Sequence, residues 1–413
     1  MLAQYWTTGP TAAQYDFIDK YNIRTTDFDT QWIFIYSSVL SDLEFVRRYG
    51  LENDQPNYAA IAQILQSYTY QILVDLYDKI PYSEALQGKE GLVSAAFQDG
   101  DIVYDDLITK VDEAIEWIDL SASAIVPGND DLIYGGDMQE WLKFANTLKL
   151  KIYTRQAIAR PNVAQAGIAA LYAEGAEFLS SEDNASIAFS AAIHNENPLW
   201  QELNQTTFDN LVASNTSLDV MKDANDARMA RVYDPSDDDQ FVGLDQGIGT
   251  QDGGQFEDYA RPDITTVINK TASVYLMTGY ESLFMQAEAA ARGWSGEDDK
   301  SLYDDAVTAA FKFWGNDIDA DDYIGAGGVY EYDGELETIY YQKWLGFNGK
   351  QGLEGWIDWR RTGVPALPLS IQGQPLPNKY PLRLIWPVTE RSANPNVPTI
   401  TSVDTPVWWD TTL

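Results

Sequence analysis

Apolar residues in the first half of the chain recur at intervals of three and four, the spacing that places them on one face of an α-helix. The helices that this pattern predicts cover residues 58–78, 101–120, 138–160 and 163–174. In the first of them the apolar stripe runs through Ile61, Leu65, Tyr68, Ile72 and Leu76. Pro81 and Pro161 follow the first and third helices, as expected of a residue that cannot continue a helix.

The periodicity fades between about residues 180 and 269, where Asp, Asn, Gly, Ser and Thr dominate. Such a composition is typical of loops. Helical spacing returns over residues 273–292 and 302–314. Beyond Arg361 the chain is rich in Pro, with one short strand predicted at residues 382–387. A chain of 413 residues exceeds the size at which a single core usually stops growing, so two lobes are expected.

Aromatic residues are unusually frequent, with 13 Trp, 25 Tyr and 15 Phe. Hydrophobic residues make up 45% of the chain, enough for a folded interior. Many of the rings must belong to that interior, and the surplus is expected at the surface. Exposed rings of this kind stack against the apolar C–H faces of sugars.

The net charge is −36, from 63 acidic and 27 basic residues. A field of this sign repels nucleic acid, which is bound mainly through Lys and Arg. It also disfavours anionic membranes and acidic polysaccharides, so a neutral ligand is expected unless a local basic pocket overrides the average. The acidity equally fits a protein from a saline environment.

The chain has no Cys and a single His, His194. Disulfides, thiolate catalysis and Cys-based metal sites are thereby excluded, and a Ser-His-Asp triad would have to use His194. The run Asp317-x-Asp319-x-Asp321 begins like a calcium loop but lacks its turn Gly and its final Glu. We therefore expect neither a metal nor another cofactor, with incidental Ca²⁺ binding at this run as the alternative. Pairs of acids are too common to indicate a glycosidase.

No apolar stretch reaches the roughly 18 residues of a membrane-spanning helix. The start of the chain also lacks the pattern of a signal peptide, and residues 2–6 are expected to belong to the folded domain already. A targeting segment is therefore expected to be missing from this sequence.

Several motifs resemble the SusD/RagB family, in particular its SusD-like branch. The most specific is Trp-x-x-Trp-Arg-Arg-Thr-Gly-x-Pro at residues 356–365, which follows Tyr-Gln-Lys-Trp at 341–344. The segment at 76–86 contains Pro-Tyr-Ser-Glu-Ala, and residues 141–146 and 390–396 also match. The residues of 356–365 also have a structural interpretation, in which the Trp side chains are core and Arg360 and Arg361 pair with acids.

The resemblance implies a mostly α-helical fold built from tetratricopeptide-like helix pairs packed against a loop-rich lobe with few short strands. We expect the helical scaffold at residues 1–178 and 270–362 and the loop-rich lobe at 179–269 and 363–413. The family implies a lipoprotein at the outer-membrane surface of a Gram-negative cell, which passes nutrients, mostly glycans, to a SusC-like TonB-dependent transporter. Its contact with the membrane would be a lipid anchor outside this sequence.

Candidate ligand-binding residues are aromatic rings in or beside predicted loops, and polar side chains next to them, because binding residues concentrate there. They are Trp6, Trp32, Tyr36, His194, Asn197, Trp200 and Tyr259. Asn and His can hydrogen-bond sugar hydroxyls while a Trp stacks on the ring. For each aromatic ring a place in the core is the alternative, and for His194 a place in a surface loop.

The function expected from these observations is non-enzymatic binding of a neutral glycan. One alternative is import of a peptide or protein, which a concave helical groove lined by Asn and Lys would favour. An exposed aromatic row in the loop-rich lobe would favour a glycan instead. A further alternative is an all-helical glycoside hydrolase, which the abundance of Trp and Asp also suits.

Overall fold

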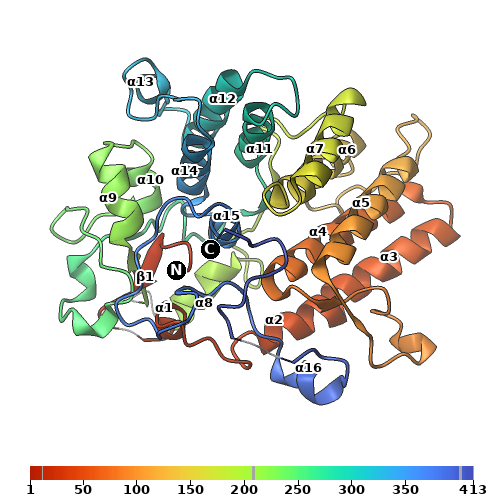
Figure 1. Ribbon diagram of the computed structural model, residues 1–413, viewed down its shortest axis with the longest axis horizontal. Helices are drawn as coiled ribbons and strands as arrows, with labels where there is room; N and C mark the ends of the chain where they lie inside the picture. The colour runs from red at the N-terminus through yellow and green to blue at the C-terminus, as the bar shows by residue number, and fades with distance from the viewer. Residues whose placement is uncertain (12, 207–209, 400–401, 413) are drawn as a thin grey trace. The chain divides into compact units, whose positions relative to one another are not determined.

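The computed structural model describes residues 1–11, 13–206, 210–399 and 402–412 (Figure 1). These residues form two units, each assembled from separate parts of the chain. Unit 1 comprises residues 1–22 and 179–375, and unit 2 comprises residues 23–178 and 376–413. This division differs from the expected lobes, because residues 270–362 group with 179–269 and not with the N-terminal helices.

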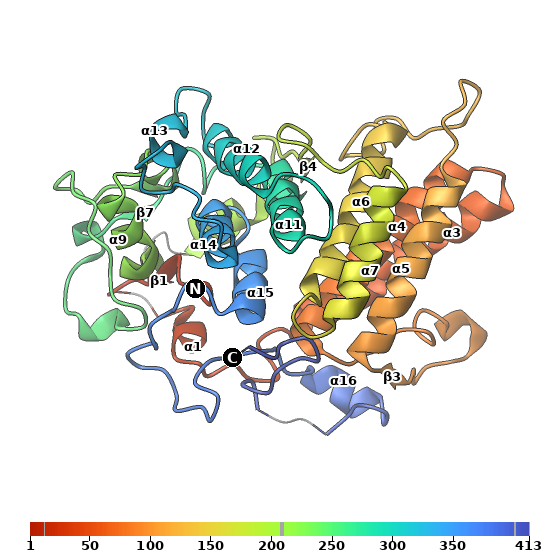
Figure 2. The ribbon, with the colours of Figure 1, turned by 45° about the horizontal axis from the view of Figure 1, so that its top comes forward.

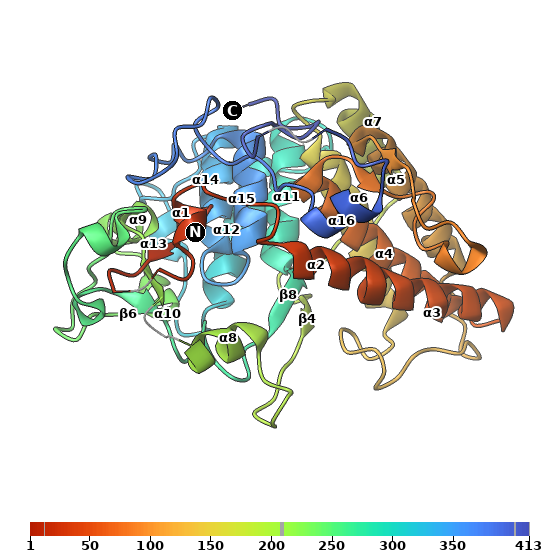
Figure 3. The same ribbon diagram turned by 90° about the horizontal axis from the view of Figure 1, so that it is seen from below.

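Unit 2 is a series of helices with one small sheet. Its main helices are α2 (Asp29–Phe34), α3 (Ser41–Glu52), α4 (Pro56–Tyr77), α5 (Gly100–Trp117), α6 (Met138–Arg155), α7 (Pro161–Ala173) and α16 (Val388–Ala393). A π-helical stretch, η1 (Ile35–Leu40), joins α2 to α3, so the three form one long helix (Figure 3). Helix α3 packs against α4, α4 against α5 and α6 against α7, and Figure 2 shows α3 to α7 side by side.

Local sequence explains where the helices of unit 2 begin and end. Helices α4 and α7 both start with Pro, which suits the first helical turn because the missing N–H has no partner there. Helix α4 ends at Tyr77, because the φ of 67° at the following Asp78 breaks the helical path ahead of strand β2 (Ile80–Pro81). Strand β2 pairs with β3 (Phe97–Gln98), and the intervening loop carries a 3₁₀ turn, η2 (Gly88–Glu90). The four helices predicted in this part of the chain are therefore confirmed.

Unit 1 combines helices with short strands and long loops. Its helices are α1 (Asp16–Asp19), α8 (Pro198–Thr206), α9 (Asn215–Asp223), α10 (Met229–Val232), α11 (Gly279–Ala291), α12 (Asp299–Lys312), α13 (Asp321–Ile324), α14 (Leu336–Phe347) and α15 (Gly352–Thr362). Its strands are β1 (Trp6–Thr8), β4 (Ala185–Ile187), β5 (Leu211–Ala213), β6 (Tyr233–Asp234), β7 (Arg261–Pro262) and β8 (Val274–Met277), and they pair as β1–β5, β4–β8 and β6–β7. Helices α11 and α12 pack together, as expected for a tetratricopeptide-like pair.

Two predictions of secondary structure are wrong. The helix expected from residue 273 begins only at Gly279, because residues 274–277 pair with β4 as strand β8. Residues 382–387 do not form a strand. The backbone N–H groups of Leu382 and Arg383 instead share one acceptor, the carbonyl of Val403, so no ladder develops.

The Trp-Arg-Arg segment lies in the core of unit 1. Trp356 and Trp359 are buried on α15, and Gly363 ends that helix with a φ of 71°, a value that glycine adopts without strain. The guanidinium of Arg361 contacts Glu288 at 2.7 Å and Asp358 at 3.0 Å. The structural interpretation is therefore confirmed for Trp356, Trp359 and Arg361, while the Arg360 guanidinium lies over the Trp356 ring at 4.1 Å.

None of the helices in the described ranges combines the length and the apolar character needed to cross a membrane.

Candidate functional site

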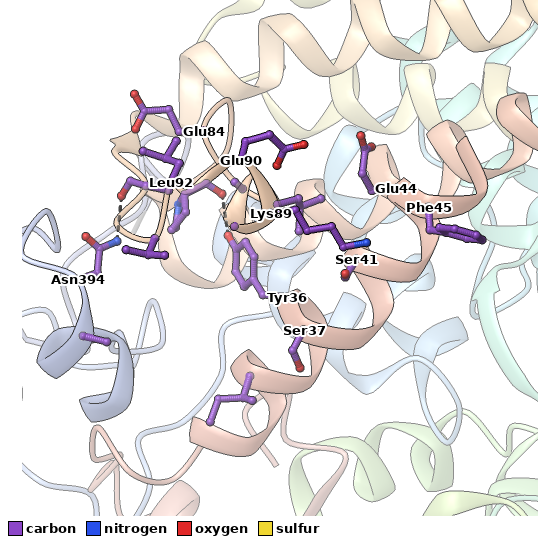
Figure 4. Close-up of a pocket in the computed structure, with 18 of the residues that line it drawn as sticks. Tyr36, Ser37, Ser41, Glu44, Phe45, Glu84, Lys89, Glu90, Leu92 and Asn394 are labelled. Atoms are coloured by element: carbon purple, nitrogen blue, oxygen red, sulfur yellow. Dashed lines mark hydrogen bonds between the residues drawn. The ribbon is translucent and has the colours of Figure 1, made fainter. Parts of the chain in front are cut away.

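A large cavity lies in unit 2. We call it cavity A, and its volume is about 780 Å³. Its walls are the long helix α2–η1–α3, the loop of residues 81–95, and residues 389–394 in and after α16. Figure 4 shows Tyr36, Ser37, Ser41 and Phe45 following one another along the helix, with Glu84, Glu90 and Leu92 on the loop. A volume of this size is typical of ligand sites.

Exposed apolar side chains line much of cavity A. Phe45 and Tyr49 are 63% and 50% exposed, and their rings stack with centroids 6.1 Å apart. Ile33 on the same long helix and Val93 on the loop are also exposed. Exposed apolar side chains gathered around one cavity mark a binding surface more often than scattered single ones do.

Trp32 and Tyr36, two of the predicted site residues, line cavity A at its buried side. Trp32 is only 3% exposed, and its ring packs against Tyr36 at 4.9 Å and Tyr77 at 4.8 Å. Its indole N–H donates to Glu390 at 3.3 Å. The Tyr36 hydroxyl donates to the carbonyl of Pro81 at 2.8 Å, and burial raises the pKa of this hydroxyl well above its usual value. These two rings support the wall of the cavity and leave little face for stacking.

Charged groups around cavity A are mostly acidic and mostly engaged. Arg48 donates to Glu44 at 2.6 Å and to Glu90 at 2.9 Å. Glu84 accepts the backbone N–H of Ala96 at 2.8 Å. Glu390 accepts from the Asn394 side chain at 2.9 Å, in addition to Trp32. The lining holds more carboxylates than cations, which disfavours an anionic ligand.

The other five predicted site residues lie in unit 1, outside the lining of cavity A. Asn197 is buried and caps helix α8: its side-chain oxygen accepts from the N–H groups of Leu199 and Trp200 at 2.9 and 3.2 Å. The ring of Trp200 is half-buried, with the Lys270 ammonium 4.6 Å from its centroid. His194 is exposed, and its backbone N–H donates to Glu196 at 2.8 Å.

Trp6 and Tyr259 complete the predicted set. Trp6 lies half-buried on β1, and its buried indole N–H has no hydrogen-bond partner in the described ranges. Tyr259 packs in a small core cluster with Val212, Leu244 and Phe256, and its hydroxyl donates to Asp252. Both residues belong mainly to the framework of unit 1.

Phe45 and Tyr49 were not predicted as site residues. Their only signal in the sequence is a spacing of four on a helix whose neighbouring positions are charged. Two rings with this spacing are as typical of the core as of a binding site. Only the structure shows that both rings are exposed.

No group of three or more His, Cys, Asp or Glu side chains is placed to hold a metal ion in the part of the chain that the structure describes.

A family model for SusD-like proteins, described as starch-binding and associating with the outer membrane, matches residues 1–387. The chain belongs to the SusD-like family. Solved structures agree on the fold. A SusD homologue from Bacteroides uniformis is 24% identical with a TM-score of 0.83, covering 99% of this chain and 93% of that one. A SusD-like protein from Bacteroides thetaiotaomicron is 23% identical with a TM-score of 0.83, covering 99% and 92%.

A chitin-binding SusD homologue from Flavobacterium johnsoniae is 22% identical to this SusD-like protein, with a TM-score of 0.82, covering 100% of this chain and 93% of that one. At such identities the comparison establishes the shared fold and leaves the ligand open. A search of curated proteins found no match.

Proposed function

We propose that this SusD-like protein binds a neutral glycan at the outer-membrane surface, without catalysis, and delivers it to a SusC-like TonB-dependent transporter. The description of its family, starch-binding and associating with the outer membrane, supports the class of ligand and the location. The names of similar structures, chitin-binding among them, point in the same direction.

The observation that carries the proposal is the stacked pair Phe45–Tyr49 at cavity A. Two exposed rings on one helix offer an apolar platform at a low entropy cost, because aromatic side chains have few rotatable bonds. Ser41, one turn before Phe45, and Ser37, one turn further back, supply neutral hydrogen-bonding groups on the same helix. A platform with adjacent polar groups matches a sugar ring, which has apolar faces and a polar edge.

The charge of the cavity supports a neutral ligand. Glu44, Glu90 and Arg48 compensate one another, and the remaining carboxylates would repel uronic acids and sulfate esters. The overall charge of −36 acts in the same direction.

A basic peptide is the second candidate ligand, and the excess of carboxylates in cavity A favours it. The cavity does not match the Asn- and Lys-lined groove that was expected for a peptide carrier, since Asn394 and Lys89 are the only residues of these types in its described lining. Nor do its exposed rings lie in the loop-rich region that was expected for a glycan carrier. The exposed aromatic platform supports the glycan over the peptide.

The test is a binding assay on the purified protein with neutral glucans, mannans and chitin oligosaccharides, acidic polysaccharides and a basic peptide. Released sugar is measured in parallel. We expect binding of one neutral glycan without sugar release, and weaker binding by about tenfold in the variant Phe45→Ala/Tyr49→Ala, which removes the platform.

Phe34→Ala is the matched control, because Phe34 is a ring of the same long helix that is 59% exposed but does not line cavity A. Release of sugar would show that the protein is a hydrolase and overturn the proposal of binding without catalysis. Binding of the peptide alone would move the function to peptide import.

A further inference from the structure

A second cavity, cavity B, lies next to cavity A in unit 2. Its volume is about 400 Å³, and residues of α3, α4, α5 and the loop after β2 line it. The two cavities share Glu44, Arg48, Ala85 and Leu86 in their linings. They are therefore neighbours separated by one wall, and each lies in the size range of ligand sites.

The lining of cavity B differs in kind from that of cavity A. It consists largely of amide and hydroxyl side chains: Gln63, Gln66, Gln87, Ser83, Tyr70 and Tyr82. It contains none of the exposed apolar side chains that surround cavity A. A site of this composition suits a small ligand rich in hydroxyl groups, because amides and hydroxyls both donate and accept hydrogen bonds.

The charged side chains of cavity B are compensated. Arg47 binds Glu44 with two hydrogen bonds of 2.8 and 2.9 Å. Lys110 contacts Glu113 at 3.0 Å, and Asp106 accepts the Tyr82 hydroxyl at 2.7 Å. Burial alone raises the pKa of Glu44, but hydrogen bonds from Arg47, Arg48 and Gln66 outweigh it and bring the pKa to about 2. No cation in the described lining is left to bind an acidic group.

Tyr70 supplies the observation that points to a ligand. Its side chain is only 6% exposed, and its ring packs edge-on against Tyr82 with centroids 4.8 Å apart. Within the described ranges its hydroxyl has no hydrogen-bond partner, although it lines cavity B. A hydroxyl that opens into a cavity without a protein partner is left to water or to a ligand.

Acceptors lie around the same cavity. The amide nitrogens of Gln63 and Gln66 donate to protein groups, namely the Lys110 carbonyl at 2.7 Å and Glu44 at 3.2 Å. Their amide oxygens accept no hydrogen bond from the described residues, and neither does that of Gln87. Cavity B therefore presents a free donor and free acceptors, the combination that sugar hydroxyls require.

The aromatic rings connect the two cavities. Tyr36 lines cavity A and contacts Tyr70 of cavity B, with ring centroids 6.5 Å apart. The shared lining and this ring contact place cavity B directly beside cavity A.

We propose that cavity B is a subsite for a neutral sugar branch of a glycan whose main chain lies in cavity A. This inference rests on the proposed function and adds to it the class of ligand, a branched neutral glycan.

The test compares matched linear and branched oligosaccharides by titration calorimetry. The pairs are cellotetraose with the xylosylated xyloglucan heptasaccharide, mannopentaose with its galactosylated form, and maltohexaose with its glucosylated form. We expect the branched member of one pair to bind about tenfold more tightly. In Tyr70→Phe this preference is lost, while the affinity for the linear member is unchanged, because only the hydroxyl is removed.

Two controls keep the test specific. Tyr58→Phe removes a hydroxyl bonded to Asp130 in unit 2, outside the linings of both cavities, and leaves the preference intact. Thermal unfolding of Tyr70→Phe is expected to match or exceed that of the original protein, since no protein hydrogen bond is lost. A fall in its unfolding temperature would show that the hydroxyl has a structural partner instead.

Equal affinity for both members of every pair, or a preference that survives in Tyr70→Phe, overturns the inference and leaves the proposed function standing. If the protein binds neither these oligosaccharides nor any other neutral glycan, both the inference and the proposed function are overturned.

Discussion

The Trp-Arg-Arg segment of unit 1 and the cavities of unit 2 use similar residue types in opposite ways. In unit 1, Trp356 and Trp359 are buried and Arg361 is bonded to Glu288 and Asp358. In unit 2, Phe45 and Tyr49 are exposed, and the Tyr70 hydroxyl has no partner in the described chain. The segment that stands out most in the sequence maintains the fold, whereas the residues that form the candidate site are inconspicuous in it.

The largest expected effect comes from breaking the buried ion pair of unit 1. Glu288→Ala leaves the Arg361 charge buried with one partner fewer, and we expect the free energy of unfolding to fall by about 3–5 kcal/mol. Urea unfolding followed by circular dichroism measures it. The control is Asp219→Ala, which removes an exposed contact to Lys222 at 3.8 Å and is expected to cost at most about 1 kcal/mol. Equal losses in the two variants would contradict the structural role assigned to Glu288.

For the exposed rings of cavity A, urea unfolding is expected to show only a small change in the free energy of unfolding. Phe45→Ala/Tyr49→Ala is expected to change the free energy of unfolding by only about 0.5 kcal/mol per residue, because both rings are exposed. Its glycan affinity is expected to fall by about tenfold. A variant that unfolds readily would show that the rings belong to the core after all.

The pH dependence of stability sharpens the comparison at Glu44, the acid shared by both cavities. Its pKa in the folded protein is about 2, below the value of about 4.3 for an unfolded chain. The ionised Glu44 therefore stabilises the folded state to its full extent at pH values above the unfolded pKa. This stabilisation is lost as pH falls from about 5 towards 2.

We expect Glu44→Gln to unfold more easily than the original protein at pH 7 and to approach it below pH 3, as measured by urea midpoints across that range. Glu52→Gln, a change of the same kind in cavity A, serves as the control. A difference between Glu44→Gln and the original protein that is constant with pH would contradict the assigned shift.

The smallest effect is expected at Trp200, the predicted stacking residue of unit 1. Its ring already has the Lys270 ammonium over it. We expect Trp200→Ala to change glycan affinity by less than about twofold, an effect well below the 1.4 kcal/mol of a tenfold change. A loss of tenfold or more would place the glycan in unit 1 and reverse the assignment of the site to cavity A.

Much of the fold could be predicted because its signals are local. The spacing of Ile61, Leu65 and Tyr68 and the position of Pro161 are properties of short segments, and the corresponding helices formed within a few residues of their predicted bounds. The failures have tertiary causes. Residues 274–277 form a strand because they pair with β4, which lies about 90 residues earlier in the chain.

The candidate site was predictable only in part. Trp32 and Tyr36, two of the predicted site residues, both line cavity A, but burial leaves little of the Trp32 ring free for a ligand. Asn197 was chosen for its hydrogen-bonding groups, and the folded chain uses them to cap α8. Residue type shows what a side chain is able to bind, while its neighbours decide which of those groups remain available.

The sequence by itself determined the family, the helical character, the excess of negative charge and the absence of cysteine chemistry. Each of these follows from residue identities or from local spacing. Only the tertiary structure decided which rings are exposed and where the cavities lie. Cavity A brings together a helix near residue 45, a loop near residue 90 and a segment near residue 390. Its shape depends on packing between segments that are distant in the chain, and no local pattern records that packing.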